Sequence, residues 1–85
     1  MPLWNNFTDL ALYFKAAESD DCKTIKYYVE ERGAPTEISN DYRETAAHIA
    51  ARNGYLDIVR YMAEKDPLIL KAGDNEGNTV FFLAI

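Results

Sequence analysis

The sequence holds few of the residues that build disulfides, metal sites and catalytic centres. Its 85 residues include one cysteine, Cys22, and one histidine, His48. A single cysteine excludes an internal disulfide and suits a reducing compartment, and a single histidine without a cysteine cluster does not make a zinc site. The sequence also lacks a glycine-rich phosphate loop, a nucleophile-and-base set and paired carboxylates at an interpretable spacing. We therefore expect a protein that is not an enzyme and that needs no cofactor or metal.

Basic residues are scarce as well, and long apolar runs are absent. Nine lysine and arginine residues stand against fourteen aspartate and glutamate residues, which gives a net charge of −5. This charge opposes phosphate backbones and anionic lipids, so we expect no nucleic-acid partner and no membrane partner. No stretch approaches the length of a transmembrane helix, and the N-terminus lacks the basic and apolar regions of a signal peptide. The prediction is a small single domain that is cytoplasmic or nuclear and not secreted.

What the sequence does contain is an internal repeat with an offset of 34 residues. The pair Ala16-Ala17 recurs as Ala50-Ala51, and Thr45 recurs as Thr79. A further set has the i, i+3, i+6 spacing of the inward face of a helix: Cys22, Ile25 and Tyr28 recur as Leu56, Val59 and Met62. One unit is therefore written about two and a half times, as in solenoid proteins.

Each unit is predicted to contain a short helix, a tight turn, a second helix and a long polar loop. In the middle unit, Thr45 caps a helix over residues 46–52, Gly54 ends it, and a second helix spans residues 55–65. The first unit repeats the plan with helices over residues 8–18 and 21–32, and the last unit has one helix over residues 79–85. Alanines make the first helix of a unit thin, whereas the second helix is bulkier and carries the apolar residues Leu56, Ile58, Val59 and Met62.

The middle unit resembles the ankyrin repeat. Its "TAAHIA", residues 45–50, matches the family signature T-P-L-H-x-A at the threonine, the histidine and the last alanine. The following "ARNGYLDIVRYM" is similar to the family's A-x-x-G-H-L-E-I-V-x-L-L, and the final "DNEGNTVFFLA" is similar to D-x-x-G-x-T-P-L-H-L-A. The resemblance implies an all-α, ankyrin-like helix-turn-helix solenoid with short β-hairpin-like fingers. It divides a single ankyrin-repeat domain over residues 1–85 into repeat one (about 5–39), repeat two (about 40–73) and partial repeat three (about 74–85).

The resemblance also assigns structural roles to the signature residues. It implies that His48 bridges Thr45 and the backbone of an adjacent loop instead of binding a ligand. The residues of this structural motif are Thr45, His48, Gly54, Gly77 and Thr79.

Two departures from the family pattern stand at turns. Arg43 occupies the place of Gly77 one repeat earlier, and Asp20 occupies the place of Gly54. If these turns need a positive φ, arginine costs on the order of 1 kcal/mol there, whereas aspartate tolerates that region. Cys22 aligns with Leu56, so we expect a small buried hydrophobic residue and not a reactive thiol.

The family resemblance implies a non-catalytic scaffold that binds a protein or peptide partner on its concave face and finger tips. Carried over by position, the partner-binding surface comprises Asp41, Tyr42, Glu44, Arg52, Asn53, Asn75, Glu76, Asn78, Glu18 and Ser19. Acidic residues prevail on this surface, so a basic or mixed-charge protein partner is expected. Tyr42 has two interpretations that both stay open: an aromatic binding hot spot at a loop tip, or a residue that packs along the neighbouring finger.

The C-terminal segment "TVFFLAI" is half a repeat without an outer helix. Repeat arrays normally end in a polar capping repeat, and the first unit resembles such a cap because Lys15 and Glu18 polarise its first helix. Three interpretations are open: the chain is a piece of a longer array, which we favour, its apolar end pairs with another copy, or the half-helix is a frayed tail. The alternative functions are therefore a regulatory N-terminal segment of a larger protein, and self-association as a homodimer through Phe81, Phe82, Leu83 and Ile85.

Overall fold

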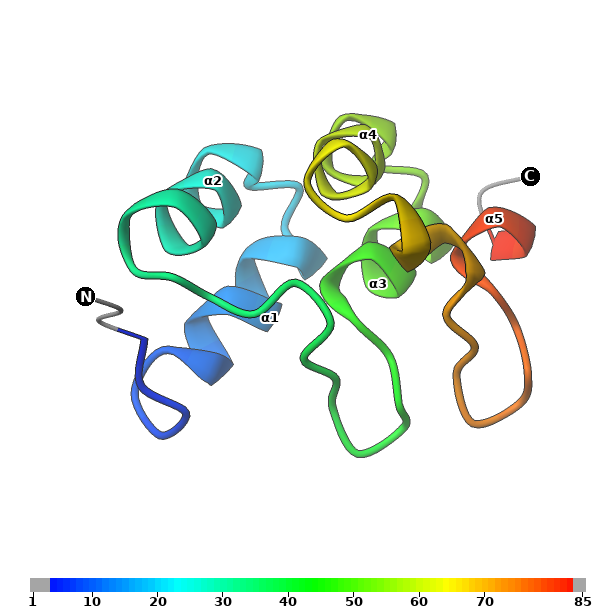
Figure 1. Ribbon diagram of the computed structural model, residues 1–85, viewed down its shortest axis with the longest axis horizontal. Coiled ribbons are helices and arrows are strands. Elements are labelled where there is room, and N and C mark those ends of the chain that lie inside the picture. Colours follow the sequence, from blue (N-terminus) through cyan, green and yellow to red (C-terminus); the bar gives the residue numbers. More distant parts are fainter. Residues whose placement is uncertain (1–3, 84–85) are drawn as a thin grey trace.

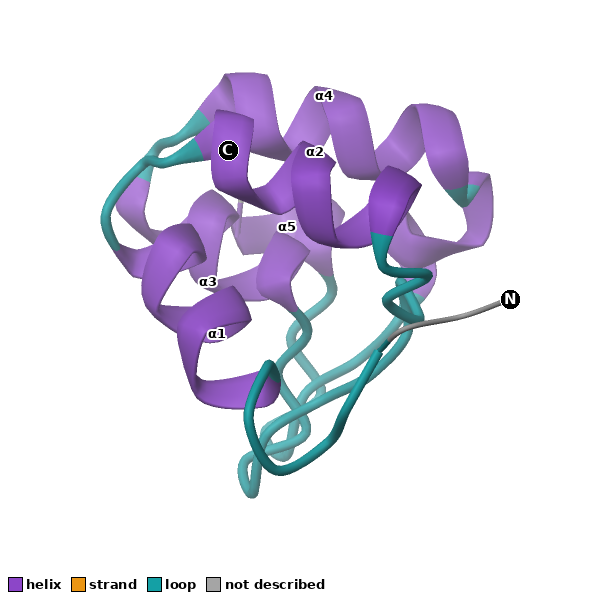
Figure 2. Cartoon of the chain, turned by 90° about the vertical axis from the view of Figure 1, so that its left-hand side faces the viewer, coloured by secondary structure: helices purple, strands orange, loops and turns teal. Residues whose placement is uncertain are grey.

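The structure, a computed structural model that describes residues 4–83, consists of helices stacked in two rows. The inner row contains α1, α3 and α5, the outer row contains α2 and α4, and the long loops project from the inner row as fingers (Figures 1 and 2). The helices of these residues are α1 (Leu10–Glu18), α2 (Cys22–Glu31), α3 (Ala46–Asn53), α4 (Leu56–Lys65), the 3₁₀ helix η1 (Pro67–Lys71) and α5 (Val80–Leu83). This arrangement confirms the predicted all-α helix-turn-helix solenoid. The helix predicted over residues 79–85 extends beyond the described residues, which end at 83.

The helices start and stop at the residues that local chemistry favours. The Thr45 hydroxyl accepts a hydrogen bond from the His48 N–H at 3.3 Å and caps α3, and the Asp21 carboxylate accepts from the Thr24 N–H at 3.1 Å and caps α2. Gly54 ends α3 with φ of 80°, and Asp20 follows α1 with φ of 57°. Gly54 thus has the left-handed conformation that the sequence predicts, and the equivalent Asp20 adopts the same region, which aspartate tolerates.

The core lies between the two rows and is centred on α3. All six residues from Ala46 to Ala51 are buried, because α3 has α1 on one side, α5 on the other and α4 above it. The alanines allow this close approach, and the larger buried residues Tyr13, Ile25, Ile58 and Met62 fill the space between the rows. The Tyr13 hydroxyl donates to the Met62 sulfur at 3.8 Å, which joins the first repeat to the second, and burial raises the pKa of this hydroxyl above its usual value.

Two predictions of burial are wrong. Leu56 was expected to face inward, but it is the first residue of α4 and is 51% exposed. Val59 and Met62 are buried as predicted, and Ile58 is buried as well. Tyr61 is also buried, and its hydroxyl donates a hydrogen bond to the Glu30 carboxylate at 2.6 Å. Cys22 is only partly buried for the same reason as Leu56, since it begins α2.

A buried aspartate links the segment before α1 to the end of α2. Asp9 precedes α1, and its carboxylate accepts from the Asn5 N–H at 3.0 Å and from the Arg32 guanidinium at 2.9 Å. Trp4 packs edge-on against Tyr13 and Tyr28, with ring centroids 5.5 and 6.0 Å away. The start of α1 and the end of α2 are thus held together by both polar and aromatic contacts.

His48 ties the inner row to the loop that follows η1. Its Nδ1 accepts a hydrogen bond from the Thr45 N–H at 3.1 Å, so the ring proton must sit on Nε2. That nitrogen lies 2.7 Å from the Ala72 carbonyl oxygen and donates to it. One fully buried side chain therefore caps α3 and fixes the position of the loop that leads to the second finger.

The first prediction concerns this tie. His48→Ala removes the cap on the Thr45 N–H and leaves the Ala72 carbonyl without its partner, so the free energy of unfolding should fall by about 2–3 kcal/mol. Urea denaturation followed by circular dichroism measures the change. Arg60→Ala is the control, because Arg60 forms only an exposed pair with Asp57 at 3.7 Å and its loss should cost less than about 0.5 kcal/mol. Equal losses in the two variants would contradict the assigned role.

Candidate partner-binding groove

Two fingers of the same construction project from the inner row (Figure 1). The first finger spans residues 39–45 and the second spans 73–79, and a single antiparallel bridge closes each at Ser39–Thr45 and Gly73–Thr79. An acceptor at the base organises the first tip: Asn40 Oδ1 accepts from the backbone N–H groups of residues 42 and 44 at 2.9 and 3.0 Å. In the second finger Asp74 Oδ1 accepts from the N–H groups of residues 76 and 78, both at 2.9 Å. The fingers are therefore rigid Asx-type turns.

The turn of each finger contains one residue in the left-handed region. Gly77 has φ of 79°, and Arg43, its equivalent, has φ of 60°. The turn at Arg43 therefore does require a positive φ, which is the condition under which an energetic cost was expected at this residue. Because L-residues with a side chain are strained there, the first finger holds a local cost that the second avoids.

In each finger a side-chain amide and a carboxylate four residues apart form a hydrogen bond, and the positions of the amide and the carboxylate are reversed between the two fingers. In the first finger the Asn40 side-chain amide donates to the Glu44 carboxylate at 3.1 Å. In the second finger the carboxylate belongs to Asp74, and Asn78 supplies the amide. Partial burial raises the pKa of Asp74, but hydrogen bonds from the backbone N–H groups of Asn78 and Glu76 outweigh this effect and hold that pKa below its usual value. Asp74 is therefore ionised at neutral pH.

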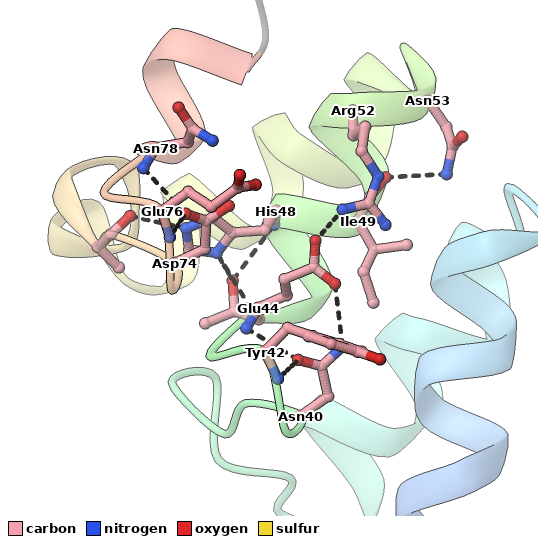
Figure 3. A network of polar contacts seen from close by, with 12 residues as sticks. Asn40, Tyr42, Glu44, His48, Ile49, Arg52, Asn53, Asp74, Glu76 and Asn78 are labelled. Carbon is pink, nitrogen blue, oxygen red and sulfur yellow. Dashed lines mark hydrogen bonds and ion pairs between the residues drawn. The ribbon is translucent and has the colours of Figure 1, made fainter.

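Glu44 was predicted at the first finger tip, but its side chain is buried at the base of the finger. It is only 8% exposed and accepts from both Asn40 and the Arg52 guanidinium, which reaches it from the last turn of α3 (Figure 3). A buried carboxylate needs such partners, because an unpaired charge away from water is costly. Glu44 and Arg52 together anchor the first finger to α3, and half of the Arg52 side chain remains exposed.

A groove of about 530 Å³ lies between the two fingers and the end of α3. Its walls consist of Tyr42 and Glu44 from the first finger, Arg52 from α3, and Asp74, Asn75 and Glu76 from the second finger. The Asn75 N–H donates to the Tyr42 carbonyl at 3.0 Å, so a backbone hydrogen bond joins the two tips. The Tyr42 side chain is 68% exposed and lines this groove.

The structure brings together half of the predicted partner-binding residues. The five that meet in the groove are Tyr42, Glu44, Arg52, Asn75 and Glu76. The other five, Asp41, Asn53, Asn78, Glu18 and Ser19, do not line it. Sequence reasoning missed one wall residue, Asp74, although its position 34 residues after Asn40 marks it as the base of the second finger.

Some of the charged side chains that line the groove form an ion pair and others do not. Arg52 is paired with Glu44, whereas no ion pair within residues 4–83 involves Asp74 or Glu76. Two carboxylates and an exposed aromatic ring therefore face the groove. This combination attracts a cation, which gains from the carboxylates and from the face of the ring.

Other sites of chemical interest are limited in the described part of the chain. Over residues 4–83, no group of three or more His, Cys, Asp and Glu side chains could hold a metal ion. Burial raises the pKa of the Cys22 thiol, and the nearby Lys26 offsets this only in part, so the thiol is not activated. Within the same residues, no helix is long and apolar enough to span a bilayer.

Comparisons with known proteins point to one family. The family model for ankyrin repeats, in three copies, matches residues 13–85. A putative ankyrin repeat protein of Acanthamoeba polyphaga mimivirus is 31% identical to this chain over 64 residues, which is 72% of this chain and 14% of the relative. The chain thus spans about a seventh of the length of the relative it matches.

The second prediction uses the strained turn. Arg43→Gly removes the steric cost of a positive φ and should raise the free energy of unfolding by about 1 kcal/mol. Part of this gain is offset because glycine increases the conformational entropy of the unfolded chain. Gly77→Ala is the reciprocal variant. A Cβ at position 77 would meet no atom within 4 Å, so its expected loss of about 1 kcal/mol reflects φ alone. Thermal and urea unfolding measure both, and the prediction fails if the two variants shift stability in the same direction.

The third prediction concerns acid stability. The pKa of Asp74 is lower in the folded protein than its ordinary value of 3.8, so the ionised carboxylate stabilises the fold. This contribution to stability is complete at pH values above 3.8, the ordinary pKa of the group, and it is lost as the pH falls through the lowered pKa of the folded state. Asp74→Asn should therefore flatten the fall of the melting temperature in this acid range, measured by circular dichroism at a series of pH values. An unchanged slope would show that the second finger does not depend on the ionised group.

Proposed function

The chain belongs to the ankyrin-repeat family, and we propose that it is a non-catalytic scaffold that binds a basic peptide segment of a partner protein in the groove between its fingers. Ankyrin repeats generally mediate protein–protein interaction. The observation that carries the proposal is the meeting of an exposed tyrosine and two carboxylates without an ion pair in one groove, at Tyr42, Asp74 and Glu76.

The groove is held in shape before any partner arrives. The side chains of Asn40 and Asp74 fix the two tips, and the hydrogen bond from Asn75 to the Tyr42 carbonyl fixes the tips relative to each other. A surface that is already ordered loses little conformational entropy on binding. Such preorganisation favours affinity from a small number of contacts.

Each wall residue has a distinct role in the proposed complex. Tyr42 offers its ring face to a lysine or arginine side chain of the partner, and Glu76 and Asp74 supply the opposing charge. Glu44 holds Arg52 in place through their ion pair, and the exposed half of the Arg52 guanidinium can donate a hydrogen bond to a backbone carbonyl or a carboxylate of the partner. The expected ligand is therefore an extended peptide with a cationic residue at its centre.

The fourth prediction tests this function with a phage-displayed random peptide library panned against the whole chain. Selected peptides should be enriched in lysine and arginine. Their affinity, measured by fluorescence polarisation, should fall at least about tenfold in Tyr42→Ala and about fivefold in Glu76→Gln, as expected for a hot-spot aromatic and an opposing charge.

Two control variants make the loss specific. Asp57→Asn removes the same unit of charge from α4, and Phe7→Ala removes an exposed aromatic ring from the turn before α1. Both should leave the affinity unchanged. Peptides without enrichment in basic residues, or affinities that respond to the controls as strongly as to Tyr42→Ala, would overturn the proposal.

A further inference from the structure

Two phenylalanines on α5 are exposed at positions that are buried everywhere else in the stack. Phe81 and Phe82 are 65% and 62% exposed. The residues one and two repeats earlier at the same positions are at most 8% exposed: Ala47, His48, Tyr13 and Phe14. Two of these earlier side chains contact segments that follow them in the stack: Tyr13 donates to the Met62 sulfur of repeat two, and His48 donates to the Ala72 carbonyl before the second finger. The side chains at the same positions of α5 are exposed, so α5 presents an apolar face that nothing covers within residues 4–83.

The opposite end of the stack presents the complementary face. A groove of about 350 Å³ between α1 and α2 is lined by apolar atoms of Leu12, Ala16 and Tyr28 and by the polar residues Lys15, Ser19, Asp21 and Thr24. Leu12 is 53% exposed there. One repeat later the equivalent positions include Ala46, Ile49, Ala50, Ile58 and Met62, which are all buried where repeat two receives repeat one.

One internal contact shows how the two faces match. The Tyr13 hydroxyl of repeat one reaches the Met62 sulfur of repeat two at 3.8 Å. Phe81 stands two repeats after Tyr13, and Tyr28 stands one repeat before Met62. The same stacking step that brings Tyr13 to Met62 would therefore bring Phe81 of one molecule to Tyr28 of another.

We propose that copies of this chain associate head to tail, with α5 of one copy seated in the groove between α1 and α2 of the next. The contact continues the α1–α3 packing across two molecules. The two helices that would meet, α1 and α5, lie at opposite ends of the inner row (Figure 1). It is heterologous, so it leaves one free face of each kind in every complex and can add further copies. The groove between the fingers lies on a different surface and stays accessible, so this inference does not depend on the proposed peptide binding.

The polar residues of the acceptor groove set the strength of the association. Lys15 and Thr24 stand where repeat two has Ile49 and Ile58, so the acceptor groove buries less apolar surface than the internal interface. The described part of α5 is also only four residues long. We therefore expect weak association that appears as the protein concentration rises, in keeping with a small interface.

The fifth prediction tests the arrangement with two variants of the whole chain, each blocked at one end. Phe82→Asp blocks the donor face and Leu12→Asp blocks the acceptor groove, both at exposed positions where a charge does not enter the core. In sedimentation velocity at increasing concentration, the wild type should form dimers and larger species, and each variant alone should remain monomeric. An equimolar mixture of the two should form a dimer and nothing larger, because each supplies the face that the other lacks.

The same experiment contains the outcomes that overturn the inference. A monomeric wild type at every concentration refutes association. A second contrary outcome is that Leu12→Asp associates by itself and that the equimolar mixture associates no further than this variant does alone. That result refutes the head-to-tail arrangement in favour of a symmetric pairing of two α5 faces. A mixture that stays monomeric while the wild type associates refutes the assigned pair of surfaces. Leu56→Asp, the same change at an exposed leucine on α4, is the control and should associate like the wild type, and circular dichroism melts verify that all variants fold.

Discussion

The structure depends on the burial of α3 from both sides. A helix of eight residues is too short to be stable alone in water, and four of the eight residues of α3 are alanines, which bury little area each. It is stable because α1, α4 and α5 surround it and exclude water from the whole run Ala46–Ala51. The small side chains that make α3 weak in isolation are those that let its neighbours approach closely. Stability in this fold is therefore a property of adjacent layers and not of any single helix.

The candidate groove follows from the same stacking. His48 uses one ring nitrogen to cap α3 and the other to hold the Ala72 carbonyl, so the layer that forms the core also sets where the second finger begins. The hydrogen bond from Asn75 to the Tyr42 carbonyl then fixes the second tip against the first. The walls of the groove lie at a distance that the stacking of two repeats determines. For this reason a loss of packing in α3 would also disturb the binding surface.

Much of the fold could be predicted from the 34-residue offset, because equivalent positions face equivalent neighbours. It placed both ends of α1, α2, α3 and α4 and the start of α5 within about two residues, which is the usual uncertainty of helix ends. The 3₁₀ helix η1 was missed, because it lies in the segment that was predicted to be a long polar loop. The errors occur where a residue's environment depends on a partner that no spacing reveals. Glu44 was predicted at an exposed tip, but its carboxylate turns back to Asn40 and Arg52. Leu56 fits the apolar stripe in sequence, yet the start of α4 places it at the surface.

The two fingers separate the residues that build a tip from those that could recognise a partner. Asn40 and Asp74 occupy one equivalent position and make the same turn with the same backbone N–H groups. Tyr42 and Glu76 occupy another and differ completely in chemistry, because at this position only the backbone N–H is needed for the turn. The side chain there can therefore change without cost to the fold, and the groove acquires an aromatic wall on one side and an acidic wall on the other. In the proposed complex, specificity would therefore be set at the positions that the repeat leaves unconstrained, and for this reason the offset that predicts the fold carries no information about the ligand.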